Sequence, residues 1–233
     1  MSYYIVKSTA LIETIKVTKT YNIGKPNEVT AVKDASVKIN EGGLVVLKGP
    51  SGSGKTTLLS LIGCQTKPTR GEVIIMGKNV SKLPEKFMNM HKRNHIGFIF
   101  QHFQLIAGMS VLDNVVLPLI PEGISPRKRN KRADRLLEQF DLAHRRHFKV
   151  SHLSGGEKQR VAIARALINN AGILLADEPS AHLDSQLTSV LLGYFKQLRR
   201  SGHTIVITSH DPIIYQHPAV DQVFEIKDGR MIS

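Results

Sequence analysis

The sequence predicts an α/β protein with a β-rich N-terminal part and an inserted helical part, and three observations support this. Short apolar runs typical of buried strands, such as 44–48 and 173–176, are separated by segments with helical spacing. Apolar and polar residues roughly alternate over 10–21 and 30–39, as in antiparallel strands with one face exposed to water. A long helical pattern over about 127–140 interrupts the succession of strands.

Composition limits the class of protein. A chain of 233 residues with 41% apolar residues can bury one substantial core. The single cysteine, Cys64, excludes an intramolecular disulfide, and the first residues lack the apolar core of a signal peptide. No stretch has the apolar length needed to span a bilayer, so we expect a cytosolic protein whose membrane role comes through a partner. The net charge of +13 fits a nucleic acid, an anionic membrane face or a nucleotide ligand.

A glycine-rich turn between a predicted strand and a predicted helix is the central feature of the chain. Residues 49–56 fit the pattern GxxxxGK[ST] of a phosphate-binding loop, in which backbone N–H groups curl around phosphate oxygens. Lys55 would reach the β- and γ-phosphates, and the Thr56 hydroxyl would ligate Mg²⁺. The flanking strand and helix disfavour the alternative, a plain Gly/Ser turn. We expect the nucleotide to contact Gly49, Pro50, Ser51, Gly52, Ser53, Gly54, Lys55, Thr56 and Thr57.

A second glycine-rich helix start lies at residues 153–160, with the sequence Leu-Ser-Gly-Gly-Glu-Lys-Gln-Arg. Ser154 is a good N-cap, and Gly155 and Gly156 leave backbone N–H groups open at the start of the helix. A helix start of this kind attracts anions. Taken singly, the segment also fits a cap with a glycine-rich hinge.

Polar side chains follow three of the predicted strands. Gln101 ends one strand, the adjacent carboxylates Asp177 and Glu178 end a second, and His210 follows a third. Alternation along a strand sends Asp177 and Glu178 in different directions, so one can hold Mg²⁺ while the other polarises a water. The alternative is an exposed acidic strand end. We expect His210 at the same sheet edge as these carboxylates.

Three further features are interpreted from the residues alone. Tyr21 ends the first predicted strand, where its ring could stack on a base or belong to the rim of a sheet. The last residues predict a hairpin with an Asp228-Gly229 turn. The helix over 127–140 begins with a basic cluster, which fits a solvated face because a separate apolar stripe runs beside it. The basic residues are Arg127, Lys128, Arg129, Lys131, Arg132 and Arg135.

The motifs, and the order in which they follow one another, resemble those of the ATPase subunits of ABC-type membrane transporters. The resemblance covers essentially the whole chain. The motifs are the phosphate loop, Gln101, residues 153–160, Asp177-Glu178, Ser180-Ala-His-Leu-Asp184 and His210. Within that superfamily, the chain is similar to the LolD/MacB branch, which serves lipoprotein release and macrolide or peptide export. The segments that carry this narrower resemblance are 61–64, 96–101 and 114–119.

The resemblance implies a P-loop NTPase (RecA-like) core with an N-terminal antiparallel β subdomain and an inserted α-helical subdomain. Residues 1–233 would be a single ABC ATPase domain, with the core at about 1–100 and 161–233 and the helical subdomain at about 101–160. ATP and Mg²⁺ are the implied cofactors. The implied partners are a second copy of the chain and an integral membrane permease, with no nucleic acid. The chain would lie in the cytoplasm, on the inner face of the cell membrane.

The resemblance also implies a role for each site residue. Tyr21 would stack on adenine, and Gln101 would touch the Mg²⁺ and the attacking water. Asp177 would hold the metal, Glu178 would be the general base, and His210 would sense the γ-phosphate. The segment Ser154, Gly155, Gly156 and Glu157 would close on the nucleotide that a second copy holds.

Two residues depart from the family pattern, and two rival functions are possible. Thr56 replaces the commoner serine but keeps the hydroxyl, whereas His182 stands where relatives usually have a small residue or Asn. A nucleic-acid-associated ABC-type ATPase shares these motifs, but such proteins insert long coiled coils between phosphate loop and signature. A soluble translation-factor ATPase needs two cassettes, and this chain has one phosphate loop.

We expect the permease to dock on residues 102–119. The apolar residues of this segment are Phe103, Leu105, Ile106, Met109 and Val111.

Overall fold

The computed structural model describes residues 10–181 and 183–232. His182, one of the two departures from the family pattern, lies outside the described residues.

A six-stranded sheet forms the centre of the protein, in the order β10-β9-β3-β8-β7-β6. The strands from β9 to β6 run parallel to their neighbours, and β10 pairs antiparallel with β9. This hairpin and its turn at Asp228-Gly229 confirm the prediction for the last residues. The strands are β3 (Leu44–Lys48), β6 (Ile96–Ile99), β7 (Ile173–Asp177), β8 (Thr204–Ser209), β9 (Gln222–Lys227) and β10 (Arg230–Ile232).

A four-stranded antiparallel sheet, in the order β2-β1-β4-β5, forms the N-terminal part. Its strands are β1 (Ala10–Tyr21), β2 (Val29–Asn40), β4 (Arg70–Ile75) and β5 (Lys78–Asn79). β1 lies between β2 and β4, and its last residue, Tyr21, pairs with Val29 on β2. The predicted antiparallel sheet is therefore confirmed.

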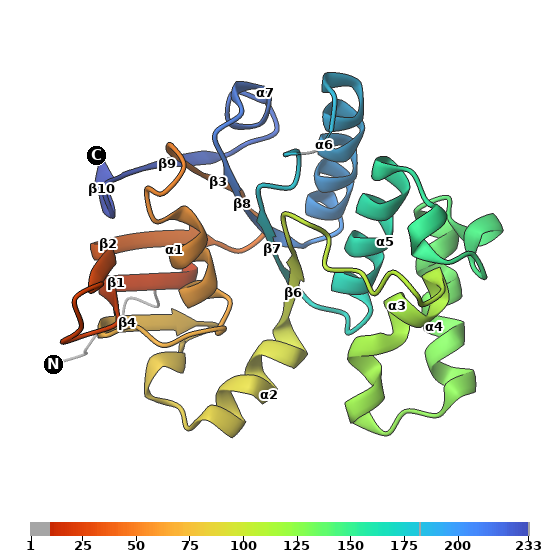
Figure 1. The fold of residues 1–233 in the computed structure, drawn as a ribbon, viewed down its shortest axis with the longest axis horizontal. Helices are drawn as coiled ribbons and strands as arrows, with labels where there is room; N and C mark the ends of the chain where they lie inside the picture. The colour runs from red at the N-terminus through yellow and green to blue at the C-terminus, as the bar shows by residue number, and fades with distance from the viewer. Residues whose placement is uncertain (1–9, 182, 233) are drawn as a thin grey trace, which may run out of the picture.

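The helices lie mainly on one side of the core sheet, as Figure 1 shows. The helix predicted over 127–140 is confirmed as α4, whereas α2 and α3 were not predicted. The α-helices are α1 (Lys55–Ile62), α2 (Glu85–His95), α3 (Val111–Val116), α4 (Pro126–Gln139), α5 (Gly155–Leu167), α6 (Ser185–Arg200) and α7 (Pro212–Tyr215). The 3₁₀ helices are η1 (Val80–Lys82), η2 (Leu117–Glu122), η3 (Ala143–Arg145) and η4 (Val150–His152).

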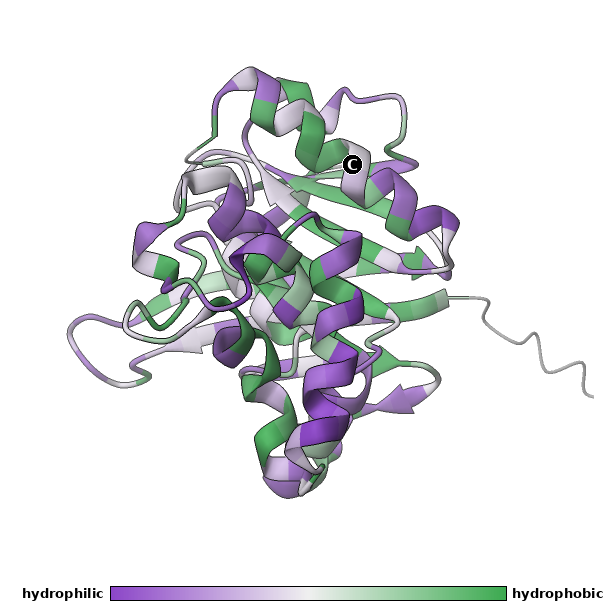
Figure 2. Cartoon of the chain, turned by 90° about the vertical axis from the view of Figure 1, so that its right-hand side faces the viewer, coloured by the Kyte–Doolittle hydropathy of each residue, from purple (hydrophilic) through white to green (hydrophobic). Residues whose placement is uncertain are grey.

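The central strands β3, β7 and β8 are buried almost throughout, which explains why they are continuous apolar runs. On β3, Leu44 and Val46 pack into one core with α5 and α6, while Val45 and Leu47 pack into a second core with α1 and the antiparallel sheet. In Figure 2 the strands seen behind the helices are largely hydrophobic, and the outer turns of the helices are largely hydrophilic. The site residues at the strand ends are thus set on a rigid, doubly covered sheet.

Two expectations about the segment after β6 need correction. β6 ends at Ile99, so Gln101 lies in the turn that follows the strand. The apolar residues of 102–119 do not form one exposed surface: Val111 is fully buried and Phe103 packs against the core, whereas Ile106 is exposed. Sequence alone did not separate these residues because each is apolar in a segment without clear periodicity.

None of the helices in residues 10–181 and 183–232 has both the length and the apolar character needed to cross a membrane.

Replacement of Phe195 tests the core under α6. Phe195 is fully buried, so Phe195→Ala leaves a cavity and should lower the free energy of unfolding by about 3–5 kcal/mol, measured by urea denaturation. Val190→Ala on the same helix is the control, because Val190 is 46% exposed and its loss should change stability little. Equal effects of the two changes would contradict this packing.

Candidate active site

The glycine-rich loop connects β3 to α1 and is held by backbone contacts from two other parts of the fold. Gly54 has φ 103°, and a Cβ there would collide with the carbonyl oxygen of Ala31 on β2. The backbone N–H of Gly229, in the β9–β10 turn, donates to the carbonyl oxygen of Ser53 at 3.0 Å. The loop conformation therefore requires glycine at Gly54 and depends on both sheets.

The remaining residues of the loop form a cradle at the N-terminus of α1. Ser51 and Gly52 are exposed, Thr57 is half-buried, and Ser53 is buried. In the described part of the chain, the Ser53 hydroxyl oxygen has no hydrogen-bond partner. A helix start with open N–H groups and an unused hydroxyl fits a phosphate ligand.

Lys55, the first residue of α1, is only 5% exposed. Its ammonium donates to the carbonyl oxygens of Gly49 and Pro50 at 2.8 and 2.9 Å. It also lies 3.3 Å from Oε1 of Glu178. The side chain thus crosses the loop and reaches the catalytic carboxylate predicted from the sequence.

Asp177, the last residue of β7, is 7% exposed and accepts two hydrogen bonds through Oδ1. One comes from the hydroxyl of Thr56 on α1 at 2.9 Å, and the other from the hydroxyl of Thr208 on β8 at 2.7 Å. Carboxylate and hydroxyl oxygens this close are the ligand type that Mg²⁺ prefers, so the donor set fits the predicted metal.

Glu178 points to other partners, as the alternation of a strand predicts. It has φ 43°, in the left-handed region, and its N–H donates to the hydroxyl of Thr208 at 2.9 Å. Its Oε2 lies 3.0 Å from Nδ1 of His210. Because an ionised carboxylate only accepts hydrogen bonds, Nδ1 of His210 carries the proton in this contact. The structure therefore brings Lys55, Glu178 and His210 into one cluster.

Gln101 and Tyr21 are predicted site residues outside this cluster. Gln101 follows β6 at the same edge of the sheet, and across the described ranges no hydrogen bond joins it to Asp177 or Glu178. Tyr21 is 40% exposed, with the ammonium of Lys19 over its ring at 5.2 Å from the centroid. Its partner Val29 is two residues from Ala31, which packs against the phosphate loop. The roles of Gln101 and Tyr21 stay predictions.

The second glycine-rich helix start is the N-terminus of α5 and carries a capping box. The Ser154 hydroxyl accepts from the N–H of Glu157 at 3.2 Å, and Oε2 of Glu157 accepts from the N–H of Ser154 at 2.8 Å. Gly155 is exposed and Gly156 is half-buried. In Figure 1, α5 and α1 lie on opposite sides of the strands β6 and β7. Within one chain, the structure does not bring this helix start to the phosphate loop.

Two residues that support the site were missed by the sequence analysis. Thr208 bonds both Asp177 and Glu178, and its place just before Ser209-His210 was a usable signal. Arg145 donates from Nε to Oε1 of Glu157 at 2.9 Å, and nothing in the sequence linked these two residues.

The fold and the site together define a class. A parallel sheet with a Gly-x₄-Gly-Lys-Thr loop after one strand, and with paired carboxylates after a strand two places along the sheet, is a P-loop nucleotide-binding protein.

Comparisons with known proteins give the family. A family model described as ABC transporter matches residues 32–181. The chain is 41% identical over 226 residues to the macrolide export ATP-binding/permease protein MacB of Pectobacterium atrosepticum and 40% identical over 224 residues to MacB of Salmonella choleraesuis. The matches cover 97% and 96% of this chain but 34% of each relative. The chain therefore spans about a third of the length of these relatives.

A solved structure supports the same family. The ATP-binding cassette MJ0796, in a dimeric post-hydrolysis state bound to ADP and Pi, is 40% identical with a TM-score of 0.86. The match covers 95% of this chain and 97% of that chain. The chain belongs to the ABC transporter family and has the fold of its ATP-binding cassettes, as the order of the motifs predicted.

The capping box of α5 predicts a pH-dependent contribution to stability. Burial acts to raise the pKa of Glu157, but hydrogen bonds from Ser154 and Arg145 outweigh it and hold the pKa below its ordinary value. A carboxyl whose pKa is lowered by folding stabilises the protein above its unfolded pKa, and this stabilisation is lost as pH falls through the folded pKa. Glu157→Gln should therefore cost about 0.5–1 kcal/mol at pH ~7 and little at an acid pH below the lowered pKa of Glu157.

Urea denaturation at the two pH values measures this difference. Glu138→Gln on the exposed side of α4 is the control and should be neutral at both. If Glu157→Gln cost the same at low pH, the charge of Glu157 would not be the source of its effect.

Proposed function

We propose that this chain is the ATP-hydrolysing subunit of a membrane ABC transporter, working as a pair of cassettes that drives a permease. The observation that carries the proposal is the cluster at the ends of β3, β7 and β8. There the loop lysine, the carboxylates Asp177 and Glu178, and His210 converge beside a phosphate cradle.

In this proposal the loop residues Gly49 to Thr57 hold the phosphates of ATP, and Tyr21 carries the adenine. Thr56 and Asp177, with Gln101 moving in from its turn, would hold Mg²⁺, which when bound neutralises charge on the phosphates. Phosphate oxygens also replace the carbonyl and carboxylate partners of the Lys55 ammonium. Oε1 of Glu178 then loses its cation and becomes available to take a proton from the attacking water.

His210 supports this step. Its Nδ1–H holds Oε2 of Glu178 at 3.0 Å, so the carboxylate keeps its orientation when Lys55 turns away. We assign to His210 the positioning of Glu178 and contact with the γ-phosphate.

A second copy would complete each site. The α5 start, with Ser154, Gly155, Gly156 and Glu157, is an anion-binding helix terminus that cannot reach the phosphate loop of its own chain. Two chains in head-to-tail, two-fold arrangement place each α5 start on the ATP of the other chain. The same assignment divides the chain into a core at about 1–100 and 161–233 and a helical subdomain at about 101–160.

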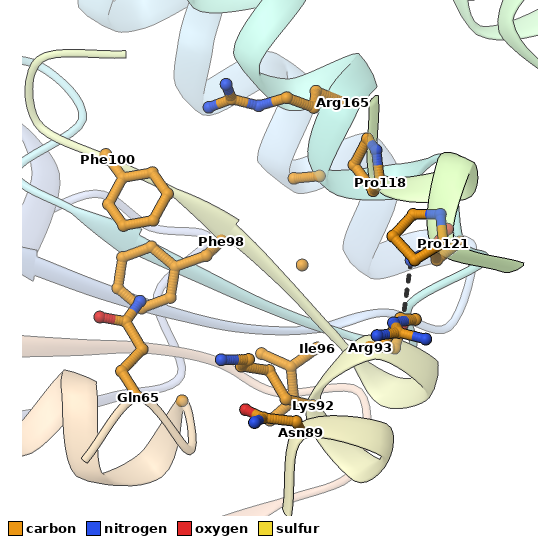
Figure 3. A pocket seen from close by; sticks show the side chains of 14 residues that line it. Gln65, Asn89, Lys92, Arg93, Ile96, Phe98, Phe100, Pro118, Pro121 and Arg165 are labelled. Atoms are coloured by element: carbon orange, nitrogen blue, oxygen red, sulfur yellow. Dashed lines mark hydrogen bonds between the residues drawn. The ribbon is translucent and has the colours of Figure 1, made fainter. Parts of the chain in front are cut away.

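A groove between the two proposed subdomains offers the permease a docking place. It has a volume of about 690 Å³ and carries three cationic side chains, Lys92, Arg93 and Arg165. Figure 3 shows the neighbouring, mutually tilted rings of Phe98 and Phe100 on one side and Pro118 and Pro121 on the other. An acidic segment of the permease with an apolar face fits these walls.

The groove is joined to the active site through the chain itself. Phe100 lines the groove and is followed directly by Gln101. Arg165 donates from Nη2 and Nη1 to the carbonyl oxygens of Phe103 and Gln104, both at 2.6 Å. Movement of Gln101 therefore reaches the groove through a short, bonded segment. We propose this groove in place of the surface over 102–119 and, with it, a location on the cytoplasmic face of the membrane.

The rival function, an ABC-type ATPase that acts on nucleic acid, would need a long coiled coil between Lys55 and Ser154. The longest helix between them, α4, has 14 residues.

Replacement of the proposed base tests hydrolysis and pairing together. Glu178→Gln should keep ATP binding but lower turnover roughly 10²–10⁴-fold, because a positioned base is lost. With excess Mg-ATP the variant should show twice the monomer mass by light scattering. Lys55→Ala is the matched control and should bind no ATP and stay monomeric. Wild-type turnover by Glu178→Gln, or a strictly monomeric variant with ATP bound, would contradict the proposal.

Crosslinking tests the groove. Pro121→Cys carrying a photo-activated crosslinker should capture a membrane protein in membranes of the source cell, whereas Val29→Cys, on the exposed N-terminal sheet, should not. The crosslinker should attach to the introduced cysteine and not to Cys64, because burial raises the pKa of the Cys64 thiol to about 11 and makes it unreactive. Capture from both positions, or from neither while ATPase activity is normal, would place the docking surface elsewhere.

A further inference from the structure

A basic cavity of about 630 Å³ lies on the edge of the core sheet opposite to the phosphate loop. Its walls come from the chain just before three parallel strands: Gly42 before β3, Arg200 before β8 and Ala219 before β9. The phosphate loop follows the other end of β3, roughly 17 Å away at the usual rise per residue of a strand. The cavity is therefore separate from the site described above.

Arg199 is one of the residues that line the cavity, and hydrogen bonds hold its guanidinium. Arg199 donates from Nε to the carbonyl oxygen of Gly42 at 3.3 Å, from Nη1 to that of Ala219 at 3.0 Å, and from Nη2 to Oδ1 of Asp221 at 2.6 Å. Oδ2 of Asp221 accepts from the backbone N–H of Leu44 at 2.8 Å. The acceptors around Arg199 are thus already engaged.

The other polar side chains of the cavity are donors. Nδ1 of His217 accepts from the backbone N–H of Ala219 at 3.1 Å, so the proton of the neutral ring is on Nε2, which can donate. Lys196 and Arg200 are exposed, and within 10–181 and 183–232 neither forms a salt bridge. The cavity therefore carries an excess of positive charge, since Asp221 offsets only one of three cations.

We propose that this cavity binds a small ligand that bears phosphate groups. Phosphate supplies several acceptor oxygens and more than one negative charge, which complements a cavity lined by donors. The volume lies within the usual range of ligand pockets. Basic residues at the end of α6 also offset the helix dipole, which accounts for Arg199 and Arg200. The helix dipole does not account for Lys196 and His217, which line the same cavity but do not belong to the last turn of α6.

Pyrophosphate is the probe for this site. The substitution Lys55→Ala removes phosphate binding at the nucleotide site. Calorimetry on this variant should therefore show one saturable site for pyrophosphate. Lys196→Gln/Arg200→Gln in the same background should weaken it roughly tenfold or more, because two charged contacts are lost. Lys128→Gln/Arg132→Gln on α4 is the matched control, with the same change in net charge and unchanged affinity expected.

Vesicles distinguish a free phosphate compound from a lipid headgroup. If phosphatidylglycerol vesicles retain the Lys55→Ala protein and lose it with the cavity substitutions, the source is a headgroup; binding of pyrophosphate alone indicates a soluble ligand. No saturable binding of either probe, or equal weakening by the α4 control, would overturn the proposal. Circular dichroism checks the fold of the variants, and Lys196→Gln alone serves if the double variant does not fold.

Discussion

A buried carboxylate connects the parts of the active site. Asp177 is almost enclosed, and a charge removed from water is costly unless it is paired or hydrogen-bonded. Thr56 and Thr208 satisfy its Oδ1, and they belong to the phosphate-loop helix and to the neighbouring strand β8. Because Thr208 also bonds the backbone N–H of Glu178, the position of the proposed base depends on the same interaction.

The central strands and the residues at their ends could be predicted because β3, β7 and β8 are covered on both faces. A strand buried on both faces must be apolar throughout, so a polar residue that interrupts the run marks the strand end. This reasoning found Asp177, Glu178 and His210. The search for helical periodicity missed α2. This helix is mostly polar, and its buried residues, Met88 and His91, leave little periodicity to detect.

The contacts between site residues could not be predicted, since they join segments that are far apart in the chain. The ion pair of Lys55 with Glu178 depends on how α1 is placed against the sheet, and that of Arg145 with Glu157 depends on how η3 is placed against α5. The motifs identified the residues that form these contacts, except Arg145 and Thr208. They did not show which residue contacts which. The apolar residues after Gln101 were misjudged for a related reason: hydrophobicity alone does not separate a side chain inside the helical part from one that lines a groove.

The bond between Gly229 and Ser53 has a consequence for the order in which the protein matures during its synthesis. The phosphate loop leaves the ribosome well before the turn that holds it, because Gly229 follows Ser53 much later in the sequence. At usual elongation rates the loop waits roughly ten seconds or more for that turn, while N-terminal elements are already able to fold. The nucleotide cradle is therefore one of the last parts of the cassette to form, and a nascent chain cannot present a finished phosphate site until translation has passed the β9–β10 turn.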